Sequence, residues 1–229
     1  MSVLLFLVTS LLLCVSDETK QEESPSLSSQ EIQETLNVLW MAILYPQVYK
    51  HLYNGNWTYA TCEVKPSANL EAGKPQVTGQ VLFKQVHPHG KLSAVFYLDG
   101  FPMGSQQTGR AIHIHEFGDL SNGCDSAGGH YNPFNDSHPH HPGDFGNFYP
   151  KDGKIRMMMS NLQANLFGGQ AILGRSVVIH ENEDDMGKGN NPGSLAHGNS
   201  GKRLACCIIG RCNKELWGKA YEGLLNMEG

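Results

Sequence analysis

The sequence lacks an excess of positive charge and, beyond its first residues, has no long hydrophobic run. Its 17 Lys and Arg residues are outnumbered by 22 Asp and Glu residues, which gives a net charge of −5 with the histidines neutral. That balance argues against nucleic acid or an acidic membrane as a partner of the whole chain. Charged residues make up 17% and hydrophobic residues 40% of the chain, which is typical of a folded globular protein rather than a disordered one.

The N-terminus contains the apolar run VLLFLVTSLLLCV, which is too short to span a bilayer comfortably. Small residues at Cys14 and Ser16 fit a cleavage site before Asp17, although no Lys or Arg precedes the run. We therefore expect residues 1–16 to be a secretory signal peptide and the mature protein to be secreted to the oxidising extracellular space. The alternative is a buried core helix.

Five cysteines remain after such a cleavage, and they bear on the fold: Cys62, Cys124, Cys206, Cys207 and Cys212. Cys206 and Cys207 are neighbours in a strand-like segment, so their side chains point to opposite faces and should find different partners. Two disulfide bonds follow if Cys62 and Cys124 each take one of them, but the spacing does not fix the connectivity. Cys212 is then a free thiol or bonds to another chain.

Residues 17–56 are predicted to be a polar leader followed by an amphipathic helix. Ser28 and Glu31 fit a capping box at its start, and Pro46 would end or kink it. Apolar residues recur at helical spacing at Ile32, Leu36, Leu39 and Ile43. This stripe either packs on its own domain or pairs with other subunits, which would make a homo-oligomer, a dimer or a tetramer joined by the N-terminal helix.

Residues 57–212 read mostly as β structure. Short apolar or alternating runs, such as KLSAVFYLDG and GRSVVIHE, are separated by Gly, Pro, Asn and Asp. Amphipathic helices do not alternate with them, which favours an antiparallel sandwich or barrel over a parallel sheet. The HPHG segment at His87 is interpreted as an exposed turn. Residues 213–229 are expected to form a short C-terminal tail.

Histidine is concentrated between Ala111 and Asn147, which holds six of the chain's 11 histidines in a segment rich in Gly, Pro, Asn and Asp. His113 and His115 are two residues apart in a strand-like run, so both imidazoles point to one face. Further candidates follow along the chain: His130, His138, His141, Asp144 and His180. Singly, each could be an ordinary exposed or hydrogen-bonded residue, but together they are typical of metal binding.

Seven candidate ligands are too many for one tetrahedral ion. If His130 lends one ring nitrogen to each of two metals, two four-donor sites result. One site has only imidazoles, which suits copper: His113, His115, His130 and His180. The other has three imidazoles and a carboxylate, which suits zinc: His130, His138, His141 and Asp144. His140, beside His141, is an alternative ligand.

With these motifs the chain resembles the copper/zinc superoxide dismutase family, and in particular its extracellular branch. The resemblance rests on HIHEFGD, GCDSAGGHYNP, HPGDFGN, VVIHENEDDMGKG and GKRLACCIIGRC, in this order. The doubled cysteine and the helical leader favour the extracellular branch. The resemblance implies an all-β fold: an eight-stranded Greek-key β-barrel, an immunoglobulin-like sandwich with long metal-binding and electrostatic loops.

The resemblance also implies the residues' roles. It assigns copper and zinc to the two sets above, with His130 shared and taking part in proton transfer. Arg203 would draw the superoxide anion toward copper, and Asp184 would accept hydrogen bonds from one copper ligand and one zinc ligand. The implied disulfide bonds are Cys124–Cys206 and Cys62–Cys207. The activity would convert superoxide to oxygen and hydrogen peroxide; the alternative is a catalytically inactive metal-binding or copper-storage module on the same barrel.

Some segments depart from the family pattern. The electrostatic loop reads NNPGSLAHGNSG, without the usual charges, so we expect weaker long-range steering, with Lys188 as the nearby cation. The last 17 residues hold two lysines and three glutamates rather than a basic run, so strong binding to heparan sulfate is not expected. Asn56 and Asn135 each begin an acceptor sequence for an N-linked glycan.

Overall fold

The computed structural model describes residues 28–45, 57–87, 90–104 and 108–225. The expected signal peptide, most of the polar leader and the acceptor residue Asn56 lie outside the described residues. Among the helices that are described, none is both long and apolar enough to cross a membrane.

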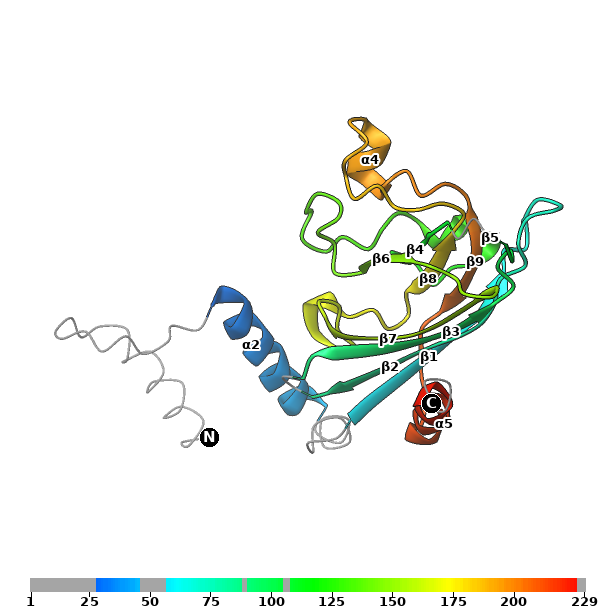
Figure 1. The fold of residues 1–229 in the computed structure, drawn as a ribbon. Helices are drawn as coiled ribbons and strands as arrows, with labels where there is room; N and C mark the ends of the chain where they lie inside the picture. Colours follow the sequence, from blue (N-terminus) through cyan, green and yellow to red (C-terminus); the bar gives the residue numbers. More distant parts are fainter. Residues whose placement is uncertain (1–27, 46–56, 88–89, 105–107, 226–229) are drawn as a thin grey trace, which may run out of the picture. The chain divides into compact units, whose positions relative to one another are not determined.

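Eight antiparallel strands form a nearly closed barrel, in the order β6-β4-β8-β9-β1-β2-β3-β7 (Figure 1). They are β1 (Trp57–Pro66), β2 (Thr78–Val86), β3 (Leu92–Asp99), β4 (Arg110–His115), β6 (Asp144–Phe148), β7 (Lys154–Leu162), β8 (Ser176–His180) and β9 (Arg203–Ile208). Strands β1, β2 and β3 pair in sequence order, whereas the chain crosses between β3 and β4 and between β7 and β8. These crossings give Greek-key connectivity, so the predicted fold class is confirmed.

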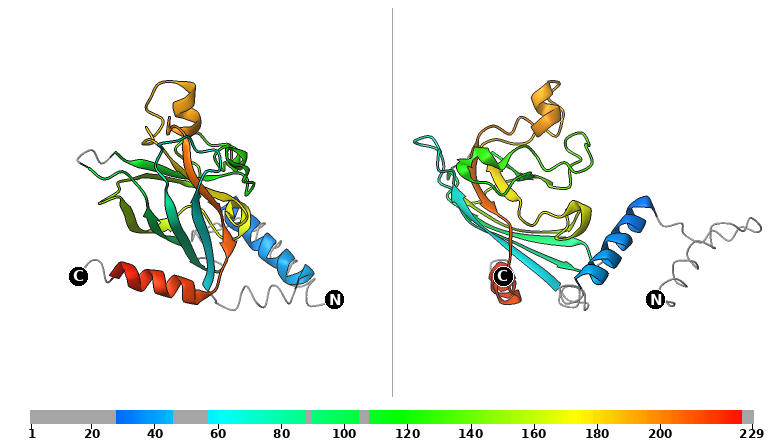
Figure 2. Two further views of the ribbon diagram at one scale, coloured as in Figure 1. Left: turned by 90° about the vertical axis from the view of Figure 1, so that its right-hand side faces the viewer. Right: turned by 180° about the vertical axis from the view of Figure 1, so that it is seen from behind.

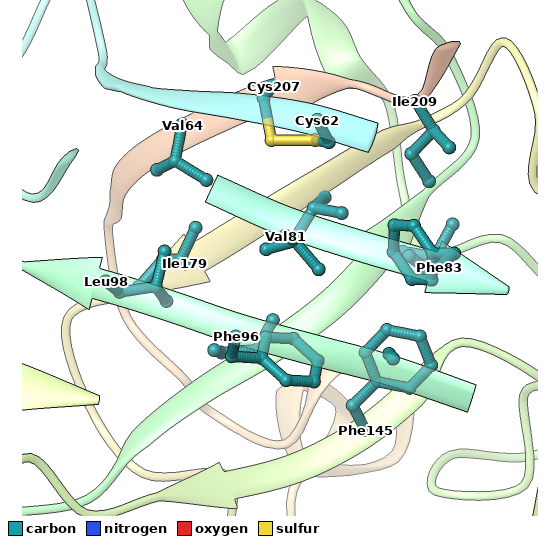
Figure 3. Packing of buried hydrophobic residues seen from close by; sticks show 14 of the residues in the cluster. Cys62, Val64, Val81, Phe83, Phe96, Leu98, Phe145, Ile179, Cys207 and Ile209 are labelled. Atoms are coloured by element: carbon teal, nitrogen blue, oxygen red, sulfur yellow. A yellow bond between two sulfur atoms is a disulfide. The ribbon is translucent and has the colours of Figure 1, made fainter. Parts of the chain in front are cut away.

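The barrel interior is filled by side chains that alternate along the strands. Val81 and Phe83 of β2 and Phe96 and Leu98 of β3 point into one cluster, where Phe96 also packs against Phe145 (Figure 3). Their neighbours in sequence face outward, as the period of two in a strand requires. This core gives the strands that carry the histidines a rigid support.

β8 is buried on both faces, which explains its continuous apolar sequence. Val177 and Ile179 pack in the barrel core, while Val178 packs with Cys124 and Ala127 of the loop outside. The loop between β4 and β6 therefore covers the outer face of β8. That loop contains the short strand β5 (Ser121–Cys124) and a single 3-10 turn, η1 (Asp125–Ala127).

Two disulfide bonds connect β9 to other parts of the chain. Cys62–Cys207 joins β1 to β9 inside the barrel, and Cys124–Cys206 joins β5 to β9 outside it (Figure 3 shows the first). The bonds close loops of 145 and 82 residues. By restricting the unfolded chain, each stabilises the fold by about 4–5 kcal/mol. Cys212, whose side chain is half-buried, takes part in neither of these bonds.

The segment expected to be only a C-terminal tail contains a helix, α5 (Lys214–Leu225). α5 packs against β1, β2 and β3 on the outside of the barrel (Figure 2). Trp217 is buried there against Leu82 and Val95, and the Tyr97 hydroxyl donates to the Ala220 carbonyl at 2.6 Å. A two-residue strand, β10 (Gly210–Arg211), pairs with β1 just before this helix.

The electrostatic loop also contains a short helix that was not predicted, α4 (Pro192–His197). The Asn191 side chain caps it by accepting from the Ser194 amide at 3.0 Å. The Asp185 carboxylate accepts hydrogen bonds from the Ser194 hydroxyl at 2.7 Å and from the side-chain amide of Asn199 at 2.6 Å, which holds the loop in place. Hydrogen bonds from uncharged side chains to the Asp185 carboxylate thus help to order the loop.

The N-terminal helix α2 (Ser29–Leu44) begins as predicted. The Ser28 backbone amide donates to Glu31 Oε2 at 2.7 Å, and the Glu31 amide donates to Ser28 Oγ at 3.3 Å, so the capping box is confirmed. The predicted apolar stripe is 45–57% exposed, at Ile32, Leu36, Leu39 and Ile43.

His87 corrects the expectation of an exposed turn. Its side chain is only 4% exposed, and its ring lies 4.2 Å from that of Phe167. The Gly90 amide donates to the Val86 carbonyl, and the His87 side chain faces inward against the loop that carries Phe167.

Candidate metal centre

Strands β4 and β8 and the loop after β4 bring the predicted ligands together. β4 and β8 are antiparallel neighbours. The ring of His180, at the end of β8, lies 5.0 Å from that of His113 and 5.4 Å from that of His115. His130 in the loop forms an isolated β-bridge with His115. β8 and the loop that carries His130, which are remote from each other in sequence, are thus both paired with β4.

The first cluster contains four imidazoles: His113, His115, His130 and His180. His115 Nε2 lies 3.2 Å from His180 Nε2. The opposite ring nitrogens face backbone carbonyls, since His115 Nδ1 lies 3.0 Å from the Gly128 oxygen and His180 Nδ1 lies 3.4 Å from the Gly201 oxygen. These carbonyls leave the Nε2 atoms of His115 and His180 facing the cluster.

The second cluster contains three imidazoles and one carboxylate: His130, His138, His141 and Asp144. Asp144 Oδ1 lies 3.1 Å from His130 Nδ1, and Asp144 Oδ2 lies 3.0 Å from Nδ1 of both His138 and His141. Three Nδ1 atoms thus converge on one carboxylate. His140, the alternative considered above, is exposed and belongs to neither cluster.

Two residues link the clusters. His130 is a member of both: its Nδ1 faces Asp144, while its Nε2 is buried without a hydrogen-bond partner among the described residues. Asp184 lies behind them, with Oδ2 at 2.9 Å from His113 Nε2 and Oδ1 at 2.8 Å from His138 Nε2. One carboxylate therefore orients one ring from each cluster.

Burial and the carboxylates set the protonation states. Burial, together with the neighbouring imidazoles, holds the pKa of His115 and of His180 well below its usual value, and burial lowers the pKa of His130 to about 4 despite Asp144. Burial also disfavours charge on His138, but hydrogen bonds to Asp144 and Asp184 outweigh it and raise its pKa to about 9. His115, His130 and His180 are therefore neutral imidazoles, and the Asp144 charge lies on the side of the second cluster.

Two buried nitrogens in these clusters lack hydrogen-bond partners among the described residues, His113 Nδ1 and His130 Nε2, while Nδ1 of His138 and of His141 has only the ion-pair contact with one oxygen of Asp144. Leaving a buried polar atom unsatisfied costs about 1–3 kcal/mol, so these nitrogens indicate places that bind cations. Donors 2.0–2.1 Å from a tetrahedral zinc are about 3.3 Å apart. The 3.0–3.1 Å separations around Asp144 are close to that spacing, and the donor sets fit copper at the first cluster and zinc at the second.

Arg203 lies at the start of β9, beside the first cluster. Its Nη1 donates to the Cys124 carbonyl at 2.8 Å and its Nη2 to the Gly128 carbonyl at 2.6 Å. The Gly128 oxygen is also the partner of His115, so one carbonyl fixes both the guanidinium and a candidate ligand. Arg203 borders a cavity of about 340 Å³, together with Lys74 and Lys202.

Comparison with known proteins identifies the family. Residues 77–209, more than half of the chain, match the model of the copper/zinc superoxide dismutase family. This chain belongs to that family. It is 53% identical over 159 residues to the extracellular superoxide dismutase [Cu-Zn] of Homo sapiens and 54% identical over 159 residues to that of Mus musculus, covering 69% of this chain in both cases. It is 40% identical over 147 residues to superoxide dismutase [Cu-Zn] A of Xenopus laevis, covering 62% of this chain and 94% of the relative.

The match to the extracellular relatives is partial, since the chain spans 66% of the human protein and 63% of the mouse protein. The resemblance drawn from the sequence motifs is nevertheless confirmed at the level of the family.

Sequence reasoning missed several groups that orient the candidate ligands. The carbonyls of Gly128, Gly201 and Asp136 face His115, His180 and His141, respectively. Every residue has a backbone carbonyl, so the residue types in the sequence do not indicate which carbonyls face the ligands. The Asn147 side chain, which pairs with both the amide and the carbonyl of Asp184, did leave one, because it ends the HPGDFGN motif.

Proposed function

We propose that the chain is a superoxide dismutase that converts two superoxide anions and two protons to dioxygen and hydrogen peroxide. The observation that carries the proposal is the position of His130, which belongs to both the all-imidazole cluster and the carboxylate-containing cluster. Membership of the copper/zinc superoxide dismutase family supports it. The four-imidazole set would hold copper and the Asp144 set would hold zinc.

Bound copper supplies one-electron redox chemistry, and bound zinc, which has no accessible redox step, supplies structural restraint. The chain's residues provide the rest. Arg203 presents a fixed positive charge beside the first cluster, which attracts and orients the substrate anion. His130, whose buried Nε2 has no hydrogen-bond partner among the described residues, would accept and return a proton there while Asp144 and the second cluster hold its Nδ1 side.

The test is a dismutase assay on protein loaded with copper and zinc, with the metal content measured in parallel. We expect activity in the wild type, loss of copper binding and activity in His180→Ala, and reduced activity with normal metal content in Arg203→Ala. A fully metallated wild type without activity would overturn the proposal. It would leave the second candidate, a metal-binding or copper-storage module, which the retained ligand set alone would support.

We further propose that the protein is secreted. The names of its human and mouse relatives describe extracellular enzymes, and two disulfide bonds suit an oxidising compartment. Detection of the mature chain in the medium of expressing cells, beginning at Asp17, tests this. Retention of the full-length chain inside the cells would contradict it.

Asn135 is proposed as a glycan acceptor, because its acceptor sequence lies exposed in the loop between His130 and His138. A mass decrease on enzymatic removal of N-glycans, lost in Ser137→Ala, would support this.

For the C-terminal segment, we propose no strong heparan sulfate anchor, since the basic and acidic residues of α5 balance: Lys214, Lys219, Glu215 and Glu222. Retention on heparin at physiological salt would contradict that.

A further inference from the structure

Arg203 is anchored by a short backbone segment rather than by side chains. Its guanidinium donates to the carbonyls of Cys124 and Gly128 at 2.8 Å and 2.6 Å and lies 3.4 Å from the Asp125 carbonyl. These acceptors all belong to residues 124–128, which include the short 3-10 turn η1. The position of the positive charge therefore depends on what holds this turn.

The loop after β1 holds the turn through Ser67. The Ser67 hydroxyl accepts a hydrogen bond from the Cys124 amide at 2.9 Å, and the Ser67 amide donates to the Leu204 carbonyl at 2.9 Å. Ser67 is only 7% exposed. Ser67 therefore links the turn at residues 124–128, whose carbonyls accept hydrogen bonds from Arg203, to Leu204, the next residue of β9.

Asn69, two residues further along, binds the acidic side chain of the same turn. Its Nδ2 donates to Asp125 Oδ2 at 2.6 Å, and its Oδ1 accepts from the Ser67 hydroxyl. The fit is close, because a Cβ at Gly123 would lie 2.5 Å from both Ser67 Oγ and Asn69 Oδ1. Asn69 thus fixes the direction of the Asp125 carboxylate.

The direction of that carboxylate matters for the positive charge. Asn69, Asp125 and Arg203 line the same cavity. The Asp125 charge acts on Arg203, since it favours the protonated guanidinium and partly offsets the lowering of the Arg203 pKa by burial. If the carboxylate turned toward the guanidinium, it would compete with any anion for that charge.

We infer that Asn69 is a positioning residue that holds the Asp125 carboxylate aside and so keeps the Arg203 guanidinium available to the substrate anion. This inference rests on the proposed dismutase function. Asn69 acts through Asp125 and does not touch the reacting atoms. Removing the amide frees a carboxylate that already acts on Arg203 across the cavity, and anion binding weakens as a result.

A double-mutant cycle of Asn69→Ala, Asp125→Asn and the double variant tests the inference. Inorganic phosphate is titrated into zinc-loaded, copper-free protein, and the side-chain NMR signals of Arg203 are followed; kcat/KM is measured on the copper- and zinc-loaded enzyme. We expect Asn69→Ala to weaken phosphate binding and lower kcat/KM by about two- to fivefold, the range of one exposed ion pair. Asp125→Asn added to Asn69→Ala should restore both quantities. Gln163→Ala, an exposed amide elsewhere, is the matched control.

Phosphate binding tests the role of Asn69, and dismutase activity tests the proposed function, so the two can fail independently. Wild-type phosphate affinity in Asn69→Ala, or no rescue by Asp125→Asn, would overturn the role of Asn69 whatever the enzyme's activity. A merely structural role would lower the thermal stability of Asn69→Ala without rescue by the second substitution. An inactive, fully metallated wild type would overturn the dismutase proposal, while the phosphate titration would still report on Asn69.

Discussion

Oδ2 of Asp184 lies 2.9 Å from Nε2 of His113, and both side chains are almost completely buried. The other carboxylate oxygen lies 2.8 Å from Nε2 of His138. With these nitrogens engaged, Nδ1 of each ring is left to face its own cluster. A single carboxylate therefore fixes the ring orientation of one candidate ligand for copper and one for zinc.

Asp184→Asn should weaken zinc binding by roughly 10- to 100-fold, the usual effect of losing an outer partner of a ligand. The amide removes the negative charge and can accept from only one of the two rings. Zinc affinity is measured by competition with a chelator, with Asp152→Asn in an exposed turn as the control. Equal affinities in the two variants would show that Asp184 does not orient the ligands.

The sequence predicted the strands and the clustered ligands because both follow short periodicities. His113 and His115 share a face through the period of two in a strand, and Cys206 and Cys207 take opposite partners for the same reason. Assignment of the full ligand set needed either the donor count or the family resemblance, because His130 and His180 are 50 residues apart in sequence and meet only through strand pairing.

Other features depend on contacts that the sequence does not display. α5 has only three turns, and its amphipathic character shows mainly in Trp217 and Tyr221, so tertiary packing on the sheet decides its position. β6 begins at the candidate ligand Asp144, within a segment whose sequence is typical of a loop. His87 is buried by Phe167, a residue 80 positions away. Neither local propensity nor spacing reports such contacts.

His141→Ala and His140→Ala should have opposite consequences, although the residues are adjacent. Loss of His141 removes one nitrogen from the second cluster, and we expect zinc affinity to fall by at least about tenfold, more than loss of an outer partner would cause. His140 is exposed and outside the clusters, so its substitution should leave zinc binding unchanged. Zinc release by a chelator, followed for both variants, decides between them; loss of zinc in His140→Ala alone would reverse the assignment.

The Cys212 thiol should react slowly in the folded protein at neutral pH. Burial raises its pKa, so the thiolate forms only above the usual range for cysteine. Since the folded pKa is the higher one, this group's contribution to stability is complete below the unfolded pKa and is lost as the pH rises through the folded pKa. Iodoacetamide labelling from pH 7 to pH 10 in folded and urea-unfolded protein measures the difference, with Cys212→Ser as the blank. Identical pH profiles would contradict the burial effect.

Trp217→Ala should destabilise the domain by about 3 kcal/mol or more, as truncation of a buried aromatic side chain usually does. Trp217 is 6% exposed, and its loss uncovers Leu82 and Val95 on the outer face of the sheet. The metal clusters lie elsewhere, so zinc content should not change. Urea unfolding of the variant is compared with Lys219→Ala on the exposed side of α5. Equal midpoints would show that α5 contributes little to the fold.

The exposed stripe of α2 should join subunits. Leu36 and Leu39 are 45% and 51% exposed, and burying the exposed half of each in a helix–helix contact would contribute roughly half of the 1.5–3 kcal/mol of a fully buried leucine. Replacing both by Glu would remove that gain and bury charge, so we expect the oligomer to lose subunits while each barrel keeps its activity. Light scattering measures the mass of wild type, of Leu36→Glu/Leu39→Glu, and of Gln30→Ala as a polar-face control. If the double variant kept the wild-type mass, the stripe would not be the subunit contact, and the association would have to lie on the barrel.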